Sequence, residues 1–334
     1  MELGLSTVGR PLTPGPLTSL ARHAEELGYD SIWTAEAWSA DAFTPLAFMA
    51  ATTTRIKLGT AIAQVAARTP ATTAMTALTL QQLSGGRLLL GLGVSGPQVV
   101  EGWHGVAFRR PIAATRDYVA IVRSALGADR KVEHSGEMYS VPYRGEDATG
   151  LGRPLRSSLP GVPQTPILLA ALGPQNVALA TEVADGLLPY LWSPNHWEKA
   201  WGETLAGAPE GFQIAPTVIA AVGDDLSACR DEVRPRIALH VGGMGSKDRN
   251  FYKSLVVRYG FEEEAERIQS LFLSGDRAGA VAAVSDELVD ELALVGPPGR
   301  VAEQLADWRR GPISTLIVEP TTDEAIDHLA RIWS

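Results

Sequence analysis

Two side chains able to exchange protons follow predicted strands. Glu36 comes shortly after an apolar strand expected at residues 31–34, and His104 lies in the loop after a strand expected at residues 88–92. Carboxylates and imidazoles are common acids and bases in enzymes, and an imidazole titrates near neutral pH. We therefore take Glu36 and His104 as candidate catalytic residues. The alternatives are a solvated or helix-capping acid for Glu36 and a surface or packing histidine for His104.

A glycine-rich segment follows the strand expected at residues 88–92. Gly91, Gly93 and Gly96 spell the G-x-G-x-x-G pattern of dinucleotide-binding folds. That pattern should open a helix in the first β-α-β unit, whereas three strand-helix units precede it here. Pro97 follows the last glycine, and Gly102 and Gly105 come soon after, so we expect no helix at this point. We interpret the segment as a loop that lets the backbone approach a flat cofactor.

Other side chains with recognition chemistry also follow predicted strands. Aromatic and amide groups there suit a planar organic substrate, and the candidate substrate contacts are Trp38, Gln64, Trp103, Tyr190 and Trp192. Gly173 and Pro174 precede a predicted helix whose free N–H groups suit a phosphate, although Gly-Pro is also a common plain helix start. The six histidines show no metal-binding spacing, and we expect no metal.

The elements that must position these residues alternate along the whole chain. Apolar strands are predicted at residues 2–7, 31–34, 56–62, 88–92, 167–170, 186–191, 214–222 and 315–319, each followed by helix. Alternation favours either a barrel or a doubly wound sheet, and the count of eight favours a (β/α)8 TIM barrel. We expect one domain over residues 1–334, with insertions at about 127–165 and 226–294, of which the second is expected to be helical.

Composition limits the partners. The net charge of −9 argues against a nucleic-acid surface, and no window approaches eighteen uninterrupted apolar residues. The N-terminus reads as a strand and not as a signal peptide. The single cysteine, Cys229, excludes an intramolecular disulfide. These features predict a cytoplasmic protein that acts on a small molecule, with neither a nucleic-acid nor a membrane partner.

Several motifs together resemble the luciferase-like monooxygenase superfamily, most closely the members that use the deazaflavin coenzyme F420. The motifs lie in barrel order at residues 27–38, 57–62, 68–70, 81–96, 169–174 and 295–301. The resemblance implies a TIM barrel, commonly a homodimer, with F420 as cofactor and FMN as the alternative. It also implies a non-prolyl cis peptide between Ala61 and Ile62 that backs the cofactor ring.

The same resemblance assigns cofactor contacts. It places Gly93, Val94, Ser95 and Gly96 at the ring or ribityl chain, and Ala171, Leu172, Gly173 and Pro174 at the phosphate region. Glu36 is carried over as a ring contact. Several relatives have a histidine after this acid, but this chain has Ala37, which makes histidine-dependent alcohol oxidation less expected. His104 is the candidate proton donor, with Glu36 and bound water as the alternatives.

The leading hypothesis is therefore an F420-dependent oxidoreductase. It would move hydride between the deazaflavin C5 and a small organic substrate, and the expected reaction is reduction of a C=C or C=N bond. One alternative is an FMN-dependent luciferase-like monooxygenase. The other is a ligand-binding barrel without catalysis.

Overall fold

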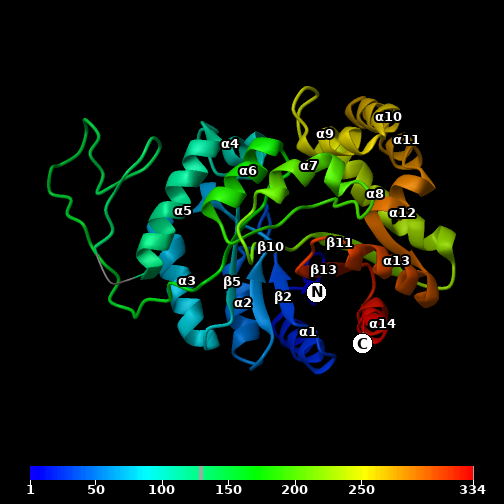
Figure 1. Cartoon of the computed structure of the whole chain (residues 1–334), viewed down its shortest axis with the longest axis horizontal. Helices are drawn as coiled ribbons and strands as arrows, with labels where there is room; N and C mark the ends of the chain where they lie inside the picture. The colour runs from blue at the N-terminus through cyan, green and yellow to red at the C-terminus, as the bar shows by residue number, and fades with distance from the viewer. Residues whose placement is uncertain (128–130, 334) are drawn as a thin grey trace.

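A closed ring of parallel strands forms the centre of the protein (Figure 1). The computed structural model describes residues 1–127 and 131–333. Parallel pairing runs through β1 (Glu2–Ser6), β2 (Ser31–Thr34), β3 (Lys57–Thr60), β5 (Leu88–Gly93), β8 (Ile167–Leu169), β9 (Gly186–Leu187) and β10 (Gln213–Ile214). The ring closes from β11 (Thr217–Val222) through β13 (Thr315–Pro320) to β1. The predicted TIM-barrel fold is confirmed.

The seventh barrel position is divided between β10 and β11. Pro216 lies between these two strands, and a proline has no N–H to donate to a ladder. The neighbouring backbone still pairs on both sides, because Ala215 N donates to Leu187 O at 2.9 Å and Ile317 N donates to Pro216 O at 2.9 Å. The two short strands therefore act as one barrel strand.

Side chains fill the inside of the barrel. A buried cluster separate from the outer core takes side chains from alternate positions of the strands: Trp33, Leu89, Leu168, Leu188, Ala215 and Ile317. A Cβ on Gly59 would lie 2.1 Å from Trp33 Cε3, so only glycine leaves room for this indole. Because this interior is closed by packing, chemistry has to take place where the strands end.

The barrel helices surround the strands, and most begin with recognisable signals. They are α1 (Pro14–Glu26), α2 (Phe43–Ala50), α3 (Pro70–Ser84), α5 (Pro111–Gly127), α6 (Pro174–Val183), α7 (Trp197–Ala206), α13 (Pro298–Arg310) and α14 (Asp323–Trp333). At α3, the Thr69 hydroxyl accepts from Thr72 N at 3.2 Å and proline occupies the first turn. No helix of the described residues is long and apolar enough to cross a membrane.

The first insertion projects away from the barrel (Figure 1). We call its described residues, 131–165, the strap; it contains the hairpin of β6 (His134–Ser135) and β7 (Ser140–Val141). Asp117 of α5 anchors this hairpin by accepting from Met138 N at 2.7 Å, Tyr139 N at 3.1 Å and His134 Nε2 at 3.0 Å.

The second insertion is helical except at its end. It contains α8 (Leu226–Gly243), α9 (Phe251–Tyr259), α10 (Glu262–Leu273), α11 (Arg277–Ala282) and α12 (Asp286–Leu292). The expectation of helix up to residue 294 is wrong, since β12 (Ala293–Gly296) pairs with β11 from Ile219 to Val222. A buried strand of four apolar or small residues next to a helix has no periodicity of its own, which explains the error.

Candidate active site

The chain bulges directly after β3. A cis peptide joins Ala61 to Ile62, as the family resemblance implies, and β4 (Ala63–Gln64) then pairs with the end of β5. The backbone N–H of Ala61 donates to Thr34 O at 2.7 Å, and that of Glu36 donates to Ile62 O at 3.1 Å. These bonds hold the bulge against the end of β2. Ala61 and Ile62 remain half-buried and so keep a surface toward the barrel mouth.

The glycine-rich segment after β5 packs against this bulge. A Cβ on Gly93 would lie 2.9 Å from Ile62 Cγ1 and 3.3 Å from Ala170 Cβ, so glycine is needed here for Ile62 to seat. Ser95, two residues further on, has a φ of 59°, a left-handed conformation that is uncommon for a residue with a side chain. Val94, Ser95 and Gly96 are half-buried.

The expectation that no helix opens after Gly96 is wrong. Helix α4 (Pro97–Gly102) begins there, and Val99 N and Val100 N both donate to Gly96 O at 3.0 Å. Pro97 favours this start because the first turn does not use its missing N–H, and burial of Val100 fixes the short helix in place. The helix carries the chain from the glycines to His104.

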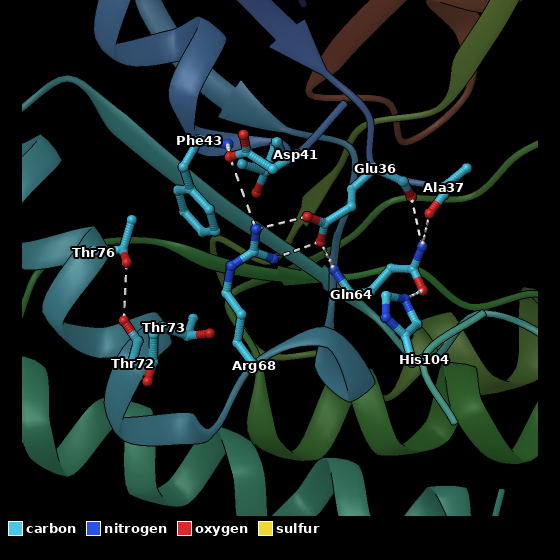
Figure 2. A network of polar contacts seen from close by, with 12 residues as sticks. Glu36, Ala37, Asp41, Phe43, Gln64, Arg68, Thr72, Thr73, Thr76 and His104 are labelled. Carbon is cyan, nitrogen blue, oxygen red and sulfur yellow. Dashed lines mark hydrogen bonds and ion pairs between the residues drawn. The ribbon is translucent and has the colours of Figure 1, made fainter. Parts of the chain in front are cut away.

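Glu36 is tied to Arg68 by two short hydrogen bonds (Figure 2). Arg68 Nη1 donates to Oε2 at 2.6 Å and Nη2 donates to Oε1 at 2.7 Å, a bidentate geometry that makes a strong ion pair. Arg68 follows the 3₁₀ helix η1 (Val65–Ala67), so the pair joins the end of β2 to the segment after β4. The hydrogen bonding that Arg68 donates to Glu36 raises the pKa of Arg68, although burial opposes this shift.

Gln64 connects Glu36 to His104 (Figure 2). Its backbone N–H donates to Glu36 Oε2 at 2.8 Å, and its side-chain Nε2 donates to the carbonyl oxygens of Glu36 at 3.1 Å and Ala37 at 2.9 Å. Its Oε1 lies 3.0 Å from Nε2 of His104. The side chains of Glu36, Gln64 and His104, predicted separately, therefore form one continuous network with Arg68.

Two side chains from other helices bind the loop before α6. Trp201 Nε1 at 2.9 Å and Arg258 Nη2 at 2.7 Å both donate to the carbonyl of Leu172. Gly173 is the N-cap of α6 and has no side chain to satisfy the first-turn N–H groups. A Cβ built on Gly173 meets only Phe251 Cδ1, at 3.9 Å, so the approach to this helix start is open.

Comparison with known proteins identifies the family. The model of luciferase-like monooxygenases matches residues 1–315. The chain belongs to this family. A Mycobacterium tuberculosis protein named "putative coenzyme F420-dependent oxidoreductase" is 42% identical over 323 residues, which cover 94% of this chain and 93% of the relative.

More distant matches also extend over most of the chain. A 5,10-methylenetetrahydromethanopterin reductase of Archaeoglobus fulgidus is 26% identical over 306 residues, covering 88% of this chain and 86% of the relative. The solved structure of the coenzyme F420-dependent tetrahydromethanopterin reductase from Methanopyrus kandleri superposes with a TM-score of 0.81 at 21% identity, covering 99% of this chain and 97% of that one. The last comparison supports the fold of this luciferase-like protein.

The aromatic residues predicted for the substrate occupy different environments in this luciferase-like barrel. Trp38 is 53% exposed and Trp103 is 64% exposed. Trp192 has 0% exposure and stacks between Trp197 at 5.5 Å and Trp201 at 5.2 Å, measured between ring centroids. Tyr190 packs on His240 at 4.7 Å, with its hydroxyl buried. Trp192 is thus a core residue in this structure, and its contact with substrate stays a prediction.

Sequence reasoning missed two charged residues near the strand ends. Arg68 lies directly before the N-cap of α3. Its position after the third predicted strand could have marked it as a candidate site residue. Glu319 is buried at the end of β13, 2.9 Å from Arg236 Nη2. Burial raises the pKa of Glu319, and the charge of Arg236 acts against that shift. A carboxylate at the end of a barrel strand was its signal.

A further hollow lies beside the start of α5. It has a volume of about 360 Å³ and lies between the start of α5 and the strap, with charged lining residues that include Arg110, Arg116 and Glu137. Arg110 pairs with Glu137, and Arg116 pairs with Glu182. Because these charges are already paired, the hollow offers less to a charged ligand than the open start of α6.

Proposed function

We propose that this protein is an F420-dependent oxidoreductase that moves hydride between the deazaflavin C5 and a small organic substrate, reducing a C=C or C=N bond. The observation that carries the proposal is the seating of His104, a group able to donate a proton, on the network beside the Ala61–Ile62 bulge. Reduction of such a bond needs a hydride on one atom and a proton on its neighbour. The name of the 42% identical relative supports F420 as the hydride carrier.

The residues present fit this cofactor. Ala61, Ile62, Val94, Ser95 and Gly96 are half-buried and would face a planar ring at the barrel mouth. We propose that Gly93 contributes by letting Ile62 form that wall. The segment Ala171, Leu172, Gly173 and Pro174 would hold the phosphate region at the open, uncapped start of α6. When bound, F420 supplies a carbon that gives or accepts hydride.

The protein's own residues would align and protonate the substrate. In this proposal, His104 donates a proton to the atom next to the reacting carbon. Both carboxylate oxygens of Glu36 accept hydrogen bonds, and these bonds hold the end of β2 and Gln64 in place. From this fixed position Glu36 would contact the deazaflavin ring. Trp38 and Trp103 have exposed surface with which to cover the substrate, and Tyr190 would border it.

The residue after Glu36 helps to distinguish between reduction and alcohol oxidation. Ala37 has no group to accept the proton of an alcohol, which supports reduction over alcohol oxidation. An FMN-dependent monooxygenase and a ligand-binding barrel remain the competing functions. Exposure of the protein to F420 and to FMN, with absorbance and oxygen uptake followed, distinguishes all three.

Each outcome of that experiment has one meaning. Return of the F420 absorbance when reduced F420 meets a panel of C=C and C=N substrates, without oxygen uptake, supports the proposal. NADH-driven reduction of FMN with oxygen uptake overturns it in favour of a monooxygenase. Cofactor binding with no turnover across the panel overturns it in favour of a binding protein.

We also propose that the protein is a cytoplasmic homodimer. Exposed apolar side chains on the adjacent helices α2 and α3 support pairing: Phe48 at 47%, Met75 at 63% and Leu83 at 66%. The single cysteine, Cys229, is buried and free, which suits a reducing compartment. Sedimentation of the wild type and of Met75→Glu tests the dimer, since a charge in the interface should yield monomers.

A further inference from the structure

The side-chain amide of Gln64 can adopt only one orientation. Its Nε2 lies 3.1 Å from Glu36 O and 2.9 Å from Ala37 O, and backbone carbonyls only accept hydrogen bonds. The amide nitrogen must therefore face these carbonyls, which leaves Oε1 facing His104. Gln64 is 1% exposed, so water does not compete for these positions.

This orientation decides where the histidine proton sits. Oε1 of Gln64 carries no hydrogen, so the 3.0 Å contact with Nε2 of His104 is a hydrogen bond only if Nε2 is the donor. A neutral imidazole has one protonated nitrogen, and here that nitrogen is Nε2. Nδ1 then holds the free electron pair, and across residues 1–127 and 131–333 no hydrogen bond to Nδ1 is found.

From this geometry we infer that Gln64 is a positioning residue that fixes His104 as the Nε2–H tautomer, so that Nδ1 is the atom that exchanges the catalytic proton. The inference rests on the proposed function for its chemical meaning. Arg68 and Glu36 act one step further away: Arg68 holds the Glu36 carboxylate, which accepts from Gln64 N at 2.8 Å. Asp41 extends the network, since its Oδ1 lies 3.8 Å from Arg68 Nη2.

The resulting step balances. The substrate carbon receives hydride, with its two electrons, from reduced F420, which becomes oxidised. The neighbouring carbon or nitrogen receives the proton from Nδ1–H of the imidazolium, and the double bond becomes single. The imidazole is left neutral with its proton on Nε2, still bonded to Gln64, and solvent returns a proton to Nδ1. The Gln64 bond is thus the same before and after transfer.

Nitrogen NMR of the ¹⁵N-histidine-labelled protein tests the tautomer directly, with no need for turnover. The signals of His104 are assigned by their loss in His104→Gln. We expect neutral His104 of the wild type to be wholly the Nε2–H form and Gln64→Leu to show a mixture with the Nδ1–H form. Gln81→Leu is the matched control, because buried Gln81 bonds Thr165 and Leu88 and does not touch His104. A substantial Nδ1–H fraction in the wild type, or no change in Gln64→Leu, overturns the inference.

The pH profile of kcat adds a readout that a purely structural role would not move. Gln64→Glu places a carboxylate against Nε2–H, which favours the imidazolium. Its falling alkaline limb should therefore move upward by about one pH unit, whereas Gln81→Leu should leave the limb in place. An unmoved limb in Gln64→Glu contradicts the inference. Full turnover in His104→Gln would instead overturn the proton role in the proposed function, so the two failures are distinguishable.

Discussion

Arg68 and Glu36 form a bidentate ion pair between two segments that follow neighbouring barrel strands. The side chains are 16% and 7% exposed, so removal of one partner leaves a largely buried charge without its bidentate partner. The guanidinium also lies 5.0 Å from the ring centroid of Phe43. The pair therefore couples stability of the fold to the shape of the site.

Arg68→Met should be strongly destabilising. We expect the free energy of unfolding to fall by about 3 kcal/mol, because Glu36 then stays buried without its partner. Urea denaturation measures the change. Arg116→Met is the control, since Arg116 and Glu182 form an exposed pair at 44% and 58% exposure, and exposed pairs contribute little. Equal midpoints for the two variants would contradict the structural role of Arg68.

Gly93→Val should weaken F420 binding. The added side chain would displace Ile62, which lies 2.9 Å from a Cβ at this position, and so deform the proposed ring wall. A fluorescence titration with F420 measures affinity, and we expect a loss of at least about tenfold, the equivalent of 1.4 kcal/mol. Gly102→Ala is the control because its Cβ meets no atom within 4 Å. Unchanged affinity in Gly93→Val would remove this loop from the site.

His104→Gln should bind F420 normally and turn over slowly. Loss of a general acid lowers the rate by roughly two orders of magnitude or more. Steady-state kinetics with a C=C or C=N substrate, together with the F420 titration, separates the two effects. His23→Gln should behave as wild type, since His23 is on the exposed face of α1 and pairs with Asp327. Wild-type kcat in His104→Gln would leave solvent as the proton source.

Asp117→Asn should release the strap from α5. Burial acts to raise the pKa of Asp117, but hydrogen bonds from Met138 N, His134 and Tyr139 N outweigh it, and the net pKa is lowered. The folded state thus favours the charged form. Its contribution to stability is complete above the unfolded carboxyl value of about 3.9 and is lost as pH falls through the lower folded pKa.

Two measurements check the Asp117 prediction. The wild type should exceed Asp117→Asn in urea midpoint at pH 7, and the difference should shrink below about pH 4. Limited proteolysis at pH 7 should cut the strap faster in Asp117→Asn than in Asp147→Asn, because Asp147 bonds only Tyr143 within the strap itself. Equal cleavage of the two variants would show that Asp117 is not the anchor.

The sequence alone predicts the barrel well because each strand is a compact apolar run and each helix carries its own stop or start. Thr69, Pro70 and Gly85 delimit α3 through local chemistry, with Gly85 at a φ of 67°. The resemblance to the family likewise located the Ala61–Ile62 cis peptide, which periodicity cannot reveal. Local rules fail where tertiary packing decides, as at α4, which buried Val100 stabilises, and at β12, which exists because β11 offers a free edge.

The site was predicted residue by residue but not as a network. Glu36, Gln64 and His104 each follow a strand, which is visible in the sequence. Their hydrogen bonds depend on the bulge at 61–64 and on α4, whose geometry emerges only in three dimensions. Arg68 escaped for the same reason, since its pairing with Glu36 spans 32 positions of the chain.

Strand β12 brings the two ends of the helical insertion together. The helical insertion leaves the barrel at the end of β11 and comes back as a strand paired with that same β11. Its entry and exit are therefore neighbours, and the intervening helices form an insertion whose two ends lie beside the same barrel strand. Because Arg258 of α9 donates to the carbonyl of Leu172, the insertion also supports the loop before α6, so a change inside it would reach the proposed phosphate region.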